Sequence, residues 1–426
     1  MHFKLKILGY LMVVKLARWL YQYKLLDVPR LRFRALARHL RKSPYYKALL
    51  QPQPELNHFP LIDKQAFMQN FNTINTGGFS LDECMEVARK AELSRDFSPM
   101  IRGISVGLST GTSGNRGVFL VSENERAVWV AMVLDRVIGL SFRKRKVAFF
   151  LRANNNLYQS TQSKRLAFHF FDIFKEMEEH IAGLNALQPS IVVAQPSVLC
   201  MLAEEQVKGN LSVAPRKIIS VAEVLSVEDK NFLQEVFNQT IHQVYQCTEG
   251  FLASSCKYGT LHFNEDFLIV EKKYIDEEKT RFHPVITDLL RRTQPVVRYE
   301  LNDIISQKPY CACGSPMLAI ESIDGRSDDI LIFENGKQQR VKLFPDVFRN
   351  TLVLCDELVS DYCLIQTDFN RLKLYVKSTD QRSFSRAKDA LERLLASYDI
   401  SQVAIEQLEQ DPLKTGEKKR RVRNEL

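Results

Sequence analysis

The first fifty residues of this 426-residue chain contain almost no acidic side chains. Asp27 is the only carboxylate among them, against twelve lysines and arginines, so this segment carries a formal charge of +11. The whole chain carries +9, which leaves −2 for the remaining residues and makes the body of the protein nearly neutral. A nucleic-acid binder needs basic patches on its folded body to neutralise phosphates. We therefore expect no nucleic-acid partner.

A long hydrophobic run is also missing. The apolar stretch Ile7–Val14 is followed at once by Lys15 and Arg18, and it is far shorter than the ~20 residues that a membrane span needs. No small-residue cleavage site follows it, and the eight cysteines are scattered, which is typical of a reduced, cytoplasmic protein. We expect a basic amphipathic helix here, whose charges either form a solvated face or make peripheral contact with anionic lipid.

The middle of the chain alternates between apolar runs of strand length and segments of helix length. The strands are expected at 147–151, 191–194, 217–221 and 241–245, and Ser226 is expected to cap a helix that ends at Phe237. This alternation predicts crossover units in a mainly parallel α/β sheet flanked by helices. After residue 260 the pattern changes to hairpin-like strands. Residues 3–50 read as two helices, the second ended by Ser43-Pro44.

A domain boundary is expected near Asp324-Gly325-Arg326. Beyond it we expect a strand at 372–376, a helix at 383–398 and a closing strand at 403–408. The helix would build its apolar face from Phe384, Ala387, Leu391, Leu394 and Tyr398. The sequence thus predicts three parts: a basic helical segment over 1–50, a large α/β domain over 51–323 and a small α+β domain over 324–426.

Small hydroxylated residues and glycines gather in one segment, Ser109-Thr110-Gly111-Thr112-Ser113-Gly114, which Asn115-Arg116-Gly117 follows. Glycine lets the backbone come close to an anion, and successive N–H groups and hydroxyls can cradle phosphate oxygens. The segment fits neither G-x-x-x-x-G-K-[ST] nor G-x-G-x-x-G. Taken by itself it is either such a cradle or a flexible turn.

Four further motifs follow along the chain. Tyr245-Gln246-Cys247-Thr248-Glu249-Gly250 comes after an expected strand. Thr287-Asp288-Leu289 precedes Pro295-Val296-Val297-Arg298-Tyr299-Glu300-Leu301-Asn302-Asp303. Asp324-Gly325-Arg326-Ser327-Asp328-Asp329 lies at the expected boundary, and Pro412-Leu413-Lys414-Thr415-Gly416-Glu417-Lys418-Lys419-Arg420 lies near the end. Each alone is an ordinary strand end, turn or solvated tail.

In this order, the motifs resemble those of the adenylate-forming superfamily, which includes acyl-CoA synthetases, peptide-synthetase adenylation domains and luciferases. The Thr-Asp-Leu and Arg-Tyr segments are similar to those of phenylacetate–CoA ligases, and the resemblance covers nearly the whole chain. It implies ATP and Mg²⁺ as cofactors, an adenylation domain over 51–323, and a mobile C-terminal domain over 324–426 with a catalytic lysine. The nearest branch is often suggested to belong to polysaccharide pathways.

The resemblance also implies roles for the hydroxylated segment and the first motif. The segment would hold the β- and γ-phosphates of ATP through Ser109, Thr110, Gly111, Thr112, Ser113, Gly114 and Arg116. Tyr245 would stack on adenine, Thr248 would reach the α-phosphate and Glu249 would hold magnesium. The chain departs from the family where Arg116 stands near the usual Gly-Lys-Pro and Gln246 replaces a glycine.

The later motifs would complete the site. By the same resemblance Asp303 and Arg326 would contact the ribose, and Asp328 would mark the hinge between the domains. A lysine near the end would bridge the substrate carboxylate and the α-phosphate. Because Glu417 follows Gly416 where lysine is usual, Lys418 is the first choice for this role and Lys419 the second.

Two pairs of soft ligands suggest a structural zinc site. Cys311 and Cys313 form a Cys-x-Cys pair, and Cys256 and His262 form a second pair on a neighbouring expected hairpin. Four such ligands suit tetrahedral zinc, whereas buried free cysteines beside an unrelated histidine are the alternative.

These patterns predict an ATP-dependent enzyme that activates a carboxylic acid as an acyl-adenylate, releases pyrophosphate and passes the acyl group to a thiol or an amine. Coenzyme A or a carrier protein would be the thiol. A catalytically weak nucleotide-binding protein of the same fold is the alternative, and a membrane-associated module built on residues 1–50 is compatible with both. The identity of the carboxylic acid substrate and the oligomeric state, including a homodimer, stay open. The segment 152–158 either lies near the expected acyl pocket or forms a polar turn.

Overall fold

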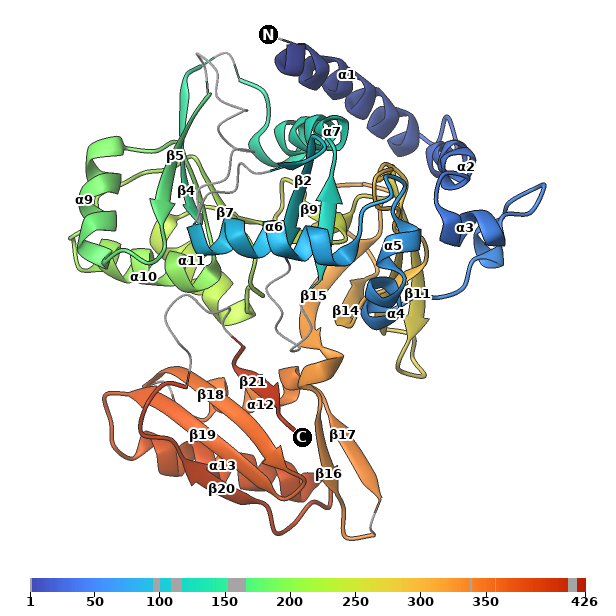
Figure 1. Ribbon diagram of the computed structural model, residues 1–426. Coiled ribbons are helices and arrows are strands. Elements are labelled where there is room, and N and C mark those ends of the chain that lie inside the picture. Colours follow the sequence, from blue (N-terminus) through green and yellow to red (C-terminus); the bar gives the residue numbers. More distant parts are fainter. Residues whose placement is uncertain are drawn as a thin grey trace. The chain divides into compact units, whose positions relative to one another are not determined.

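The computed structural model describes residues 2–94, 100–108, 117–141, 143–151, 166–337, 339–356, 358–412 and 420–426. The chain divides into two compact units (Figure 1). Unit 1 comprises Met1–Leu301 and Gln307–Glu321, and unit 2 comprises Asn302–Ser306 and Ser322–Leu426. Residues 1–50 thus lie within unit 1, and the chain passes into unit 2 for the last time at Ser322.

The N-terminal segment forms three helices where two were predicted: α1 (His2–Gln22), α2 (Val28–Leu40) and α3 (Pro44–Leu49). Ser43-Pro44 does not merely end a helix. The Ser43 hydroxyl accepts a hydrogen bond from the backbone N–H of Tyr46, so serine caps α3 and proline takes its first turn, where it needs no N–H. Phe33 of α2 and Tyr46 both contact Phe59 in edge-to-face geometry, which anchors these helices on unit 1.

The predicted parallel strands are confirmed at β4 (Arg145–Leu151), β6 (Ile191–Ala194), β7 (Lys217–Ser220) and β8 (Ile241–Cys247). They pair in the order β4-β6-β7-β8, and β5 (Leu166–Asp172) adds a parallel edge strand. Three helices pack against them through a shared apolar core: α9 (Met177–Leu187), α10 (Pro196–Val207) and α11 (Val227–Phe237). Ser226 caps α11 as predicted, by accepting a hydrogen bond from the Asp229 N–H.

Antiparallel pairs, such as β8 with β9 and β9 with β10, extend the same sheet beyond β8. The full order is β11-β12-β14-β15-β10-β9-β8-β7-β6-β4-β5, with β13 beside β12. The added strands are β9 (Gly250–Ser255), β10 (Leu261–Phe263), β11 (Leu268–Tyr274), β12 (Arg281–Asp288), β13 (Tyr299–Glu300), β14 (Asp303–Lys308) and β15 (Ala319–Arg326).

The remaining elements of unit 1 precede the large sheet in sequence. A separate antiparallel sheet contains β1 (Met100–Ile101), β2 (Ile104–Leu108) and β3 (Val118–Val121). The helices are the 3-10 helix Leu56–His58, α4 (Lys64–Gln69), α5 (Phe71–Ile74), α6 (Leu81–Ser94), α7 (Glu123–Val133) and the π-helix η2 (Leu134–Ile138).

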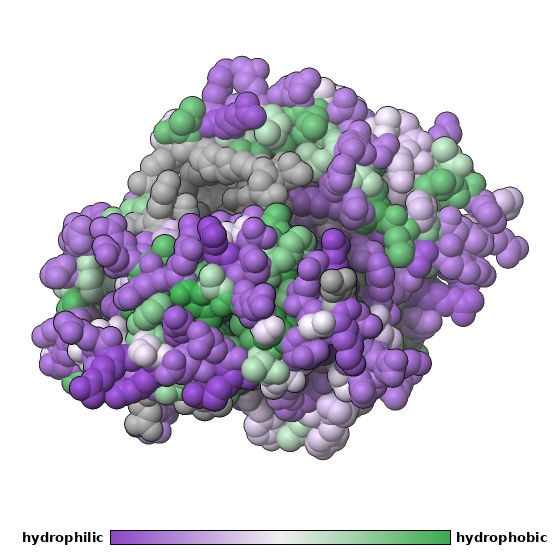
Figure 2. All heavy atoms as spheres, turned by 90° about the horizontal axis from the view of Figure 1, so that it is seen from below, coloured by the Kyte–Doolittle hydropathy of each residue, from purple (hydrophilic) through white to green (hydrophobic). Residues whose placement is uncertain are grey.

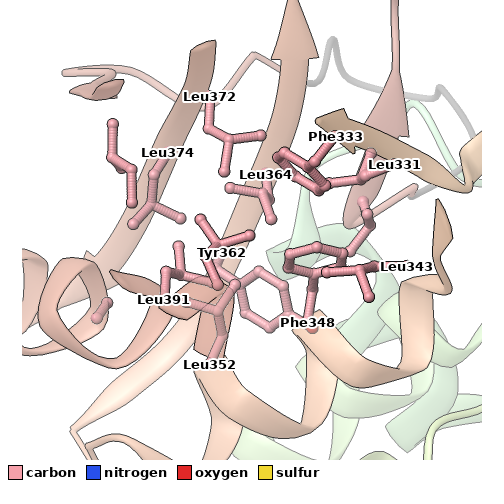
Figure 3. Close-up of a cluster of buried hydrophobic side chains, with 14 of the residues drawn as sticks. Leu331, Phe333, Leu343, Phe348, Leu352, Tyr362, Leu364, Leu372, Leu374 and Leu391 are labelled. Carbon is pink, nitrogen blue, oxygen red and sulfur yellow. The ribbon is translucent and has the colours of Figure 1, made fainter. Parts of the chain in front are cut away.

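Unit 2 is an α+β module with its own core (Figure 3). Its elements are the 3-10 helix Ser327–Asp329, β16 (Leu331–Glu334), β17 (Arg340–Leu343), α12 (Pro345–Leu354), β18 (Val359–Asp368), β19 (Arg371–Ser378), α13 (Ser383–Ser397), β20 (Ala404–Gln407) and β21 (Val422–Asn424). Strands β20-β19-β18-β21 form one sheet. In α13, Ala387 and Leu391 are buried as predicted, but Tyr398 follows the helix and is exposed, while Leu395 is buried instead.

Hydrophilic side chains cover most of the face seen in Figure 2, and hydrophobic ones gather there in smaller patches, as is usual for folded proteins. Among the described residues, none of the helices combines the length and the apolar character needed to cross a membrane. The fold class predicted from the sequence, a large α/β part with a small C-terminal α+β part, is confirmed.

Candidate active site

The Thr248-Glu249 turn joins β8 to β9 and holds a carboxylate in a fixed orientation. The Thr248 hydroxyl donates to one oxygen of Glu249 over 2.9 Å, and the Tyr299 hydroxyl donates to the other, also over 2.9 Å. Tyr299 is buried, and burial together with the neighbouring carboxylate raises the pKa of its phenol. The phenol therefore stays protonated and donates throughout the neutral range.

Arg291 and Gln294 link this turn to the strand that follows the hydroxylated segment. The Arg291 guanidinium donates to the carbonyl of Thr248 and, over 3.2 Å, to that of Leu120 in β3. The Gln294 side chain accepts from the Leu120 N–H over 3.0 Å and donates to the Val118 carbonyl over 3.1 Å. The N–H and carbonyl groups of Leu120 are thereby both hydrogen-bonded to the segment that carries Arg291 and Gln294.

The hydroxylated segment lies outside the described residues, but both of its ends are placed. Strands β2 and β3 pair antiparallel, with Leu108 opposite Val118. Ser109–Arg116 therefore connects two neighbouring strand ends of a hairpin, and one of these strands is held by the arginine that also holds the Thr248 carbonyl. The predicted phosphate-binding role of the segment stays a prediction.

A half-buried carboxylate, Glu125, organises the backbone beside this link. It accepts from the Ser122 N–H and hydroxyl and from the N–H groups of Arg292 and Thr293. Burial alone would raise the pKa of Glu125, but the hydrogen bonds from Ser122 and Thr293 lower it below its ordinary value. The ionised carboxylate thus fixes the start of α7 against the segment that carries Arg291.

Asp288, from the Thr-Asp-Leu motif, forms hydrogen bonds within its own turn. Its side chain accepts from the N–H groups of Leu290 and Arg291 over 2.8 and 3.1 Å. Complete burial raises the pKa of this carboxyl. Asp288 therefore shapes the turn from which the Arg291 side chain reaches Thr248.

Tyr245 is buried in β8, and its ring contacts Phe263 with centroids 6.2 Å apart. Next to it, Gln246 accepts a hydrogen bond from the Trp129 indole over 3.1 Å. A glycine at position 246 would lose this link between β8 and α7. The adenine-stacking role of Tyr245 stays a prediction.

In unit 2, the structure brings Asp303 and Arg326 together. The Arg326 Nε lies 3.4 Å from an oxygen of Asp303. Asn302, next to Asp303, donates to Asp328 over 2.5 Å and accepts from the Ser327 N–H over 2.7 Å. An ion pair and hydrogen bonds thus join the two segments that are expected to contact the ribose and to form the hinge.

Gly325 occupies a backbone conformation that favours glycine, with φ of +138°. A Cβ atom there would lie 3.2 Å from Pro345 Cγ. The preceding residue, Asp324, accepts a hydrogen bond on each of its two carboxylate oxygens, from the hydroxyls of Ser306 and Ser322. The expected hinge motif therefore has a glycine for a steric reason and an aspartate for a hydrogen-bonding one.

The two candidate catalytic lysines, Lys418 and Lys419, lie outside the described residues. The next residue, Arg420, is described and forms an ion pair with the buried Asp329. Burial raises the pKa of Asp329, although the guanidinium of Arg420 opposes this. The end of the predicted lysine motif is thereby fixed to the Gly-Arg-x-Asp-Asp motif within unit 2.

The four predicted zinc ligands lie together in unit 1. The ligand atoms of Cys256, His262, Cys311 and Cys313 all lie within 4.8 Å of one another. The Cys256 and Cys311 sulfurs are 3.8 Å apart, and His262 Nε2 is 3.4 Å from the Cys313 sulfur. His262 Nδ1 lies 3.0 Å from the Met317 carbonyl, a contact that commonly orients a metal-binding imidazole.

Several side chains in this site were not assigned by the sequence. Arg291, Gln294 and Tyr299 lie within or beside the quoted motifs, but their partners are far away in the sequence and no local pattern identifies them. Glu125 had a local signal, because Ser122 and Glu125 form a capping box at the start of α7.

Comparison with known proteins connects this geometry to a fold. No protein-family model matches the sequence, and no curated protein matches it either. Solved structures do match. A 2-hydroxyisobutyryl-CoA ligase in the postadenylation state, in complex with 2-HIB-AMP, has a TM-score of 0.61 at 15% identity, covering 98% of this chain and 88% of that one.

Two other solved structures are similar at lower scores. An anthranilate-CoA ligase in complex with anthranoyl-AMP has a TM-score of 0.53 at 14% identity, covering 74% of this chain and 65% of that one. An amide bond synthetase from Marinactinospora thermotolerans has a TM-score of 0.53 at 13% identity, covering 73% and 66%. This chain therefore has the fold of adenylate-forming ligases, as the resemblance of its motifs predicted.

Proposed function

We propose that this protein uses ATP to activate a carboxylic acid as an acyl-adenylate and then transfers the acyl group to a thiol or an amine. In the first step a carboxylate oxygen attacks the α-phosphorus of ATP. The bond from that phosphorus to the bridging oxygen breaks, and pyrophosphate leaves with the electron pair.

One observation carries this proposal: the Glu249 carboxylate is ordered by two hydroxyls, and its turn is joined through Arg291 to the strand that follows the hydroxylated segment. In a chain with this fold, that arrangement supports a site for the phosphates of a nucleotide. Ser109–Gly114 and Arg116 would take the β- and γ-phosphates, and Thr248 the α-phosphate. Asp303 and Arg326 would take the ribose hydroxyls.

Magnesium fits the chemistry of Glu249. Carboxylate oxygens and nucleotide phosphates are the ligands that this ion prefers, and among the described residues each Glu249 oxygen accepts a single hydrogen bond. When bound, magnesium would neutralise charge on the phosphates. Tyr299 would keep the carboxylate aimed, and Lys418, or else Lys419, would stabilise the charge that develops around the α-phosphorus.

We also propose that Cys256, His262, Cys311 and Cys313 hold a structural zinc ion. Four soft ligand atoms within 4.8 Å of one another support a closed tetrahedral site. Such a site leaves no position for substrate, so its role would be to clamp the loops that follow β9 and β14. The sequence resemblance alone extends the proposal to a polysaccharide pathway and to coenzyme A, a carrier protein or an amine as acceptor.

The test is exchange of labelled pyrophosphate into ATP by the full-length protein across a broad panel of carboxylic acids. We expect acid-dependent exchange that Glu249→Gln lowers by about a hundredfold, since the variant removes the charge while keeping the shape. Glu271→Gln on β11 is the matched control, because its carboxylate pairs with Arg298 and has no proposed contact with nucleotide.

A folded protein that binds ATP without any acid-dependent exchange would instead support the nucleotide-binding alternative. Lys418→Ala and Lys419→Ala, made separately, then assign the catalytic lysine. The variant that lacks the catalytic lysine should lose pyrophosphate exchange, whereas Lys388→Ala on α13 should keep it. If both terminal variants keep full exchange, neither lysine has the proposed role.

A further inference from the structure

Helix α1 has an apolar face that packs against α7, and ion pairs flank this contact. Buried Ile7 shares a core with Ala127 and Val130 of α7, the helix that α1 packs against (Figure 1), and Leu11 of α1 is buried as well. At the edges of this contact, Lys6 pairs with Glu123 over 2.7 Å, and Lys15 and Arg18 pair with the buried Asp135 over 3.4 and 3.0 Å. These contacts fix the rotation of α1 about its own axis.

The opposite face of α1 is also apolar, although it is exposed. We call it the α1 outer face; it consists of Leu5, Leu8, Met12, Val13, Leu16 and Trp19 of the helix and of Tyr23 directly after it, each between 50% and 66% exposed. Exposed Leu25, Leu26 and Leu31 continue it toward α2. The spacing of three and four residues places these side chains on one side of the helix, with no charged residue among them.

Helix α2 has a contrasting exposed face made of arginines. Arg30, Arg34, Arg38 and Arg41 are exposed and recur at helical spacing, and we call them the α2 arginine face. Within the part of the chain that the structure describes, their one side-chain hydrogen bond runs from Arg38 to the Arg34 carbonyl. Asp27, the single acid of the segment, accepts from the Arg30 N–H and caps α2.

We propose that the α1 outer face and the α2 arginine face bind together to an anionic lipid membrane surface. An interfacial helix places its apolar side chains at the acyl boundary while cations contact the phosphates of the headgroups. Trp19 and Tyr23 are suited to that boundary because their rings are amphipathic. The ion pairs to Asp135 and Glu123 keep α1 packed along the rest of unit 1. The helix would therefore lie along the membrane surface and would not span the membrane.

Charge favours a membrane over a second copy of this chain. Residues 1–50 carry +11, so two such segments facing each other would repel, whereas an anionic leaflet attracts them. A fully solvated helix is also disfavoured, since a contiguous apolar face of this kind commonly marks an interaction site.

Vesicle flotation with the full-length protein tests this proposal. The vesicles contain phosphatidylcholine alone or phosphatidylcholine with phosphatidylglycerol. One variant replaces the outer face, L8Q/M12Q/L16Q, and another neutralises the arginine face, R30Q/R34Q/R38Q/R41Q. The matched control V207Q/V227Q changes valines that are 68% and 63% exposed on α10 and α11.

We expect the wild type and the control to float with anionic vesicles and only weakly with neutral ones. Each α1 or α2 variant should lower the partition coefficient at least about tenfold, while its circular dichroism and melting stay those of the wild type. Folded wild type that stays with the vesicle-free fraction would overturn the proposal, as would equal flotation of the outer-face variant. A third contradicting result would be a wild-type protein that does not bind vesicles but forms a dimer in light scattering, if the outer-face substitutions convert that dimer to a monomer. The readout needs no nucleotide, so it is independent of the proposed enzymatic activity.

Discussion

At the scale of single residues, the orientation of Glu249 depends on a neighbour that is distant in the sequence. Tyr299 reaches it from β13 and is buried, with its ring also packed edge-to-face on Phe67. A donor held this rigidly restricts the carboxylate to one rotamer. A motif supplies the carboxylate, but the three-dimensional fold supplies its direction.

Tyr299→Phe should therefore impair the proposed acid activation without unfolding the protein. The variant keeps the ring and its packing but removes the hydroxyl, so Glu249 is no longer fixed for magnesium. We expect pyrophosphate exchange to fall by roughly tenfold and the magnesium concentration for half-maximal exchange to rise. Tyr258→Phe, at an exposed position of unit 1, is the control. An unchanged magnesium requirement in Tyr299→Phe would show that the hydroxyl does not position the ligand.

His242 on β8 makes stability depend on pH. Burial and the nearby charge of Lys217 lower the pKa of His242 to about 4, from about 6.5 in an unfolded chain. Between these values the unfolded chain takes up a proton that the folded protein does not, so folding stability decreases as the pH falls from 6.5 to 4. Denaturant unfolding at pH 7 and pH 5 should show a smaller loss of unfolding free energy for His242→Gln than for the wild type. Equal losses in both proteins would contradict this assignment.

At the scale of elements, the sequence predicted what is encoded locally. The strand β6 is a short, fully buried apolar run, as expected for a parallel strand covered on both faces, and Ser226 caps α11 through a neighbour three residues away. Ser43-Pro44 was misjudged because the same pair can end one helix and begin another. The link from Arg291 to Thr248 spans 43 residues and has no local pattern, so it could not be predicted.

The Cys/His cluster brings together side chains from three segments of unit 1. Cys256 follows β9, His262 lies in β10, and Cys311 and Cys313 follow β14. Cys313→Ser should lower the bound zinc from about one per chain and lower the melting temperature by roughly 5 °C, because a clamp on three segments is lost. Cys200→Ser on α10, outside the cluster, should retain zinc. Wild-type protein that binds neither zinc nor cobalt at these residues would exclude the metal site.

At the scale of the whole molecule, the two units have separate hydrophobic cores. The core of unit 2 gathers Phe348 and Leu364 with Leu391 of α13, and every member lies between residues 331 and 422 (Figure 3). The core under α9, α10 and α11 includes Leu202 and Leu233, and its members lie between residues 148 and 241. Loss of packing in one core therefore removes no contact from the other.

This separation predicts that core substitutions act on one unit at a time. Leu391 and Leu233 are both fully buried, so Leu391→Ala and Leu233→Ala each leave a cavity that costs about 2–5 kcal/mol. In differential scanning calorimetry, we expect Leu391→Ala to lower the transition of unit 2 and Leu233→Ala that of unit 1, because each cavity weakens only its own core. Limited proteolysis near the melting temperature should accordingly cut first in the unit that carries the substitution. If both variants shift one common transition by the same amount, the two units unfold as a single cooperative body.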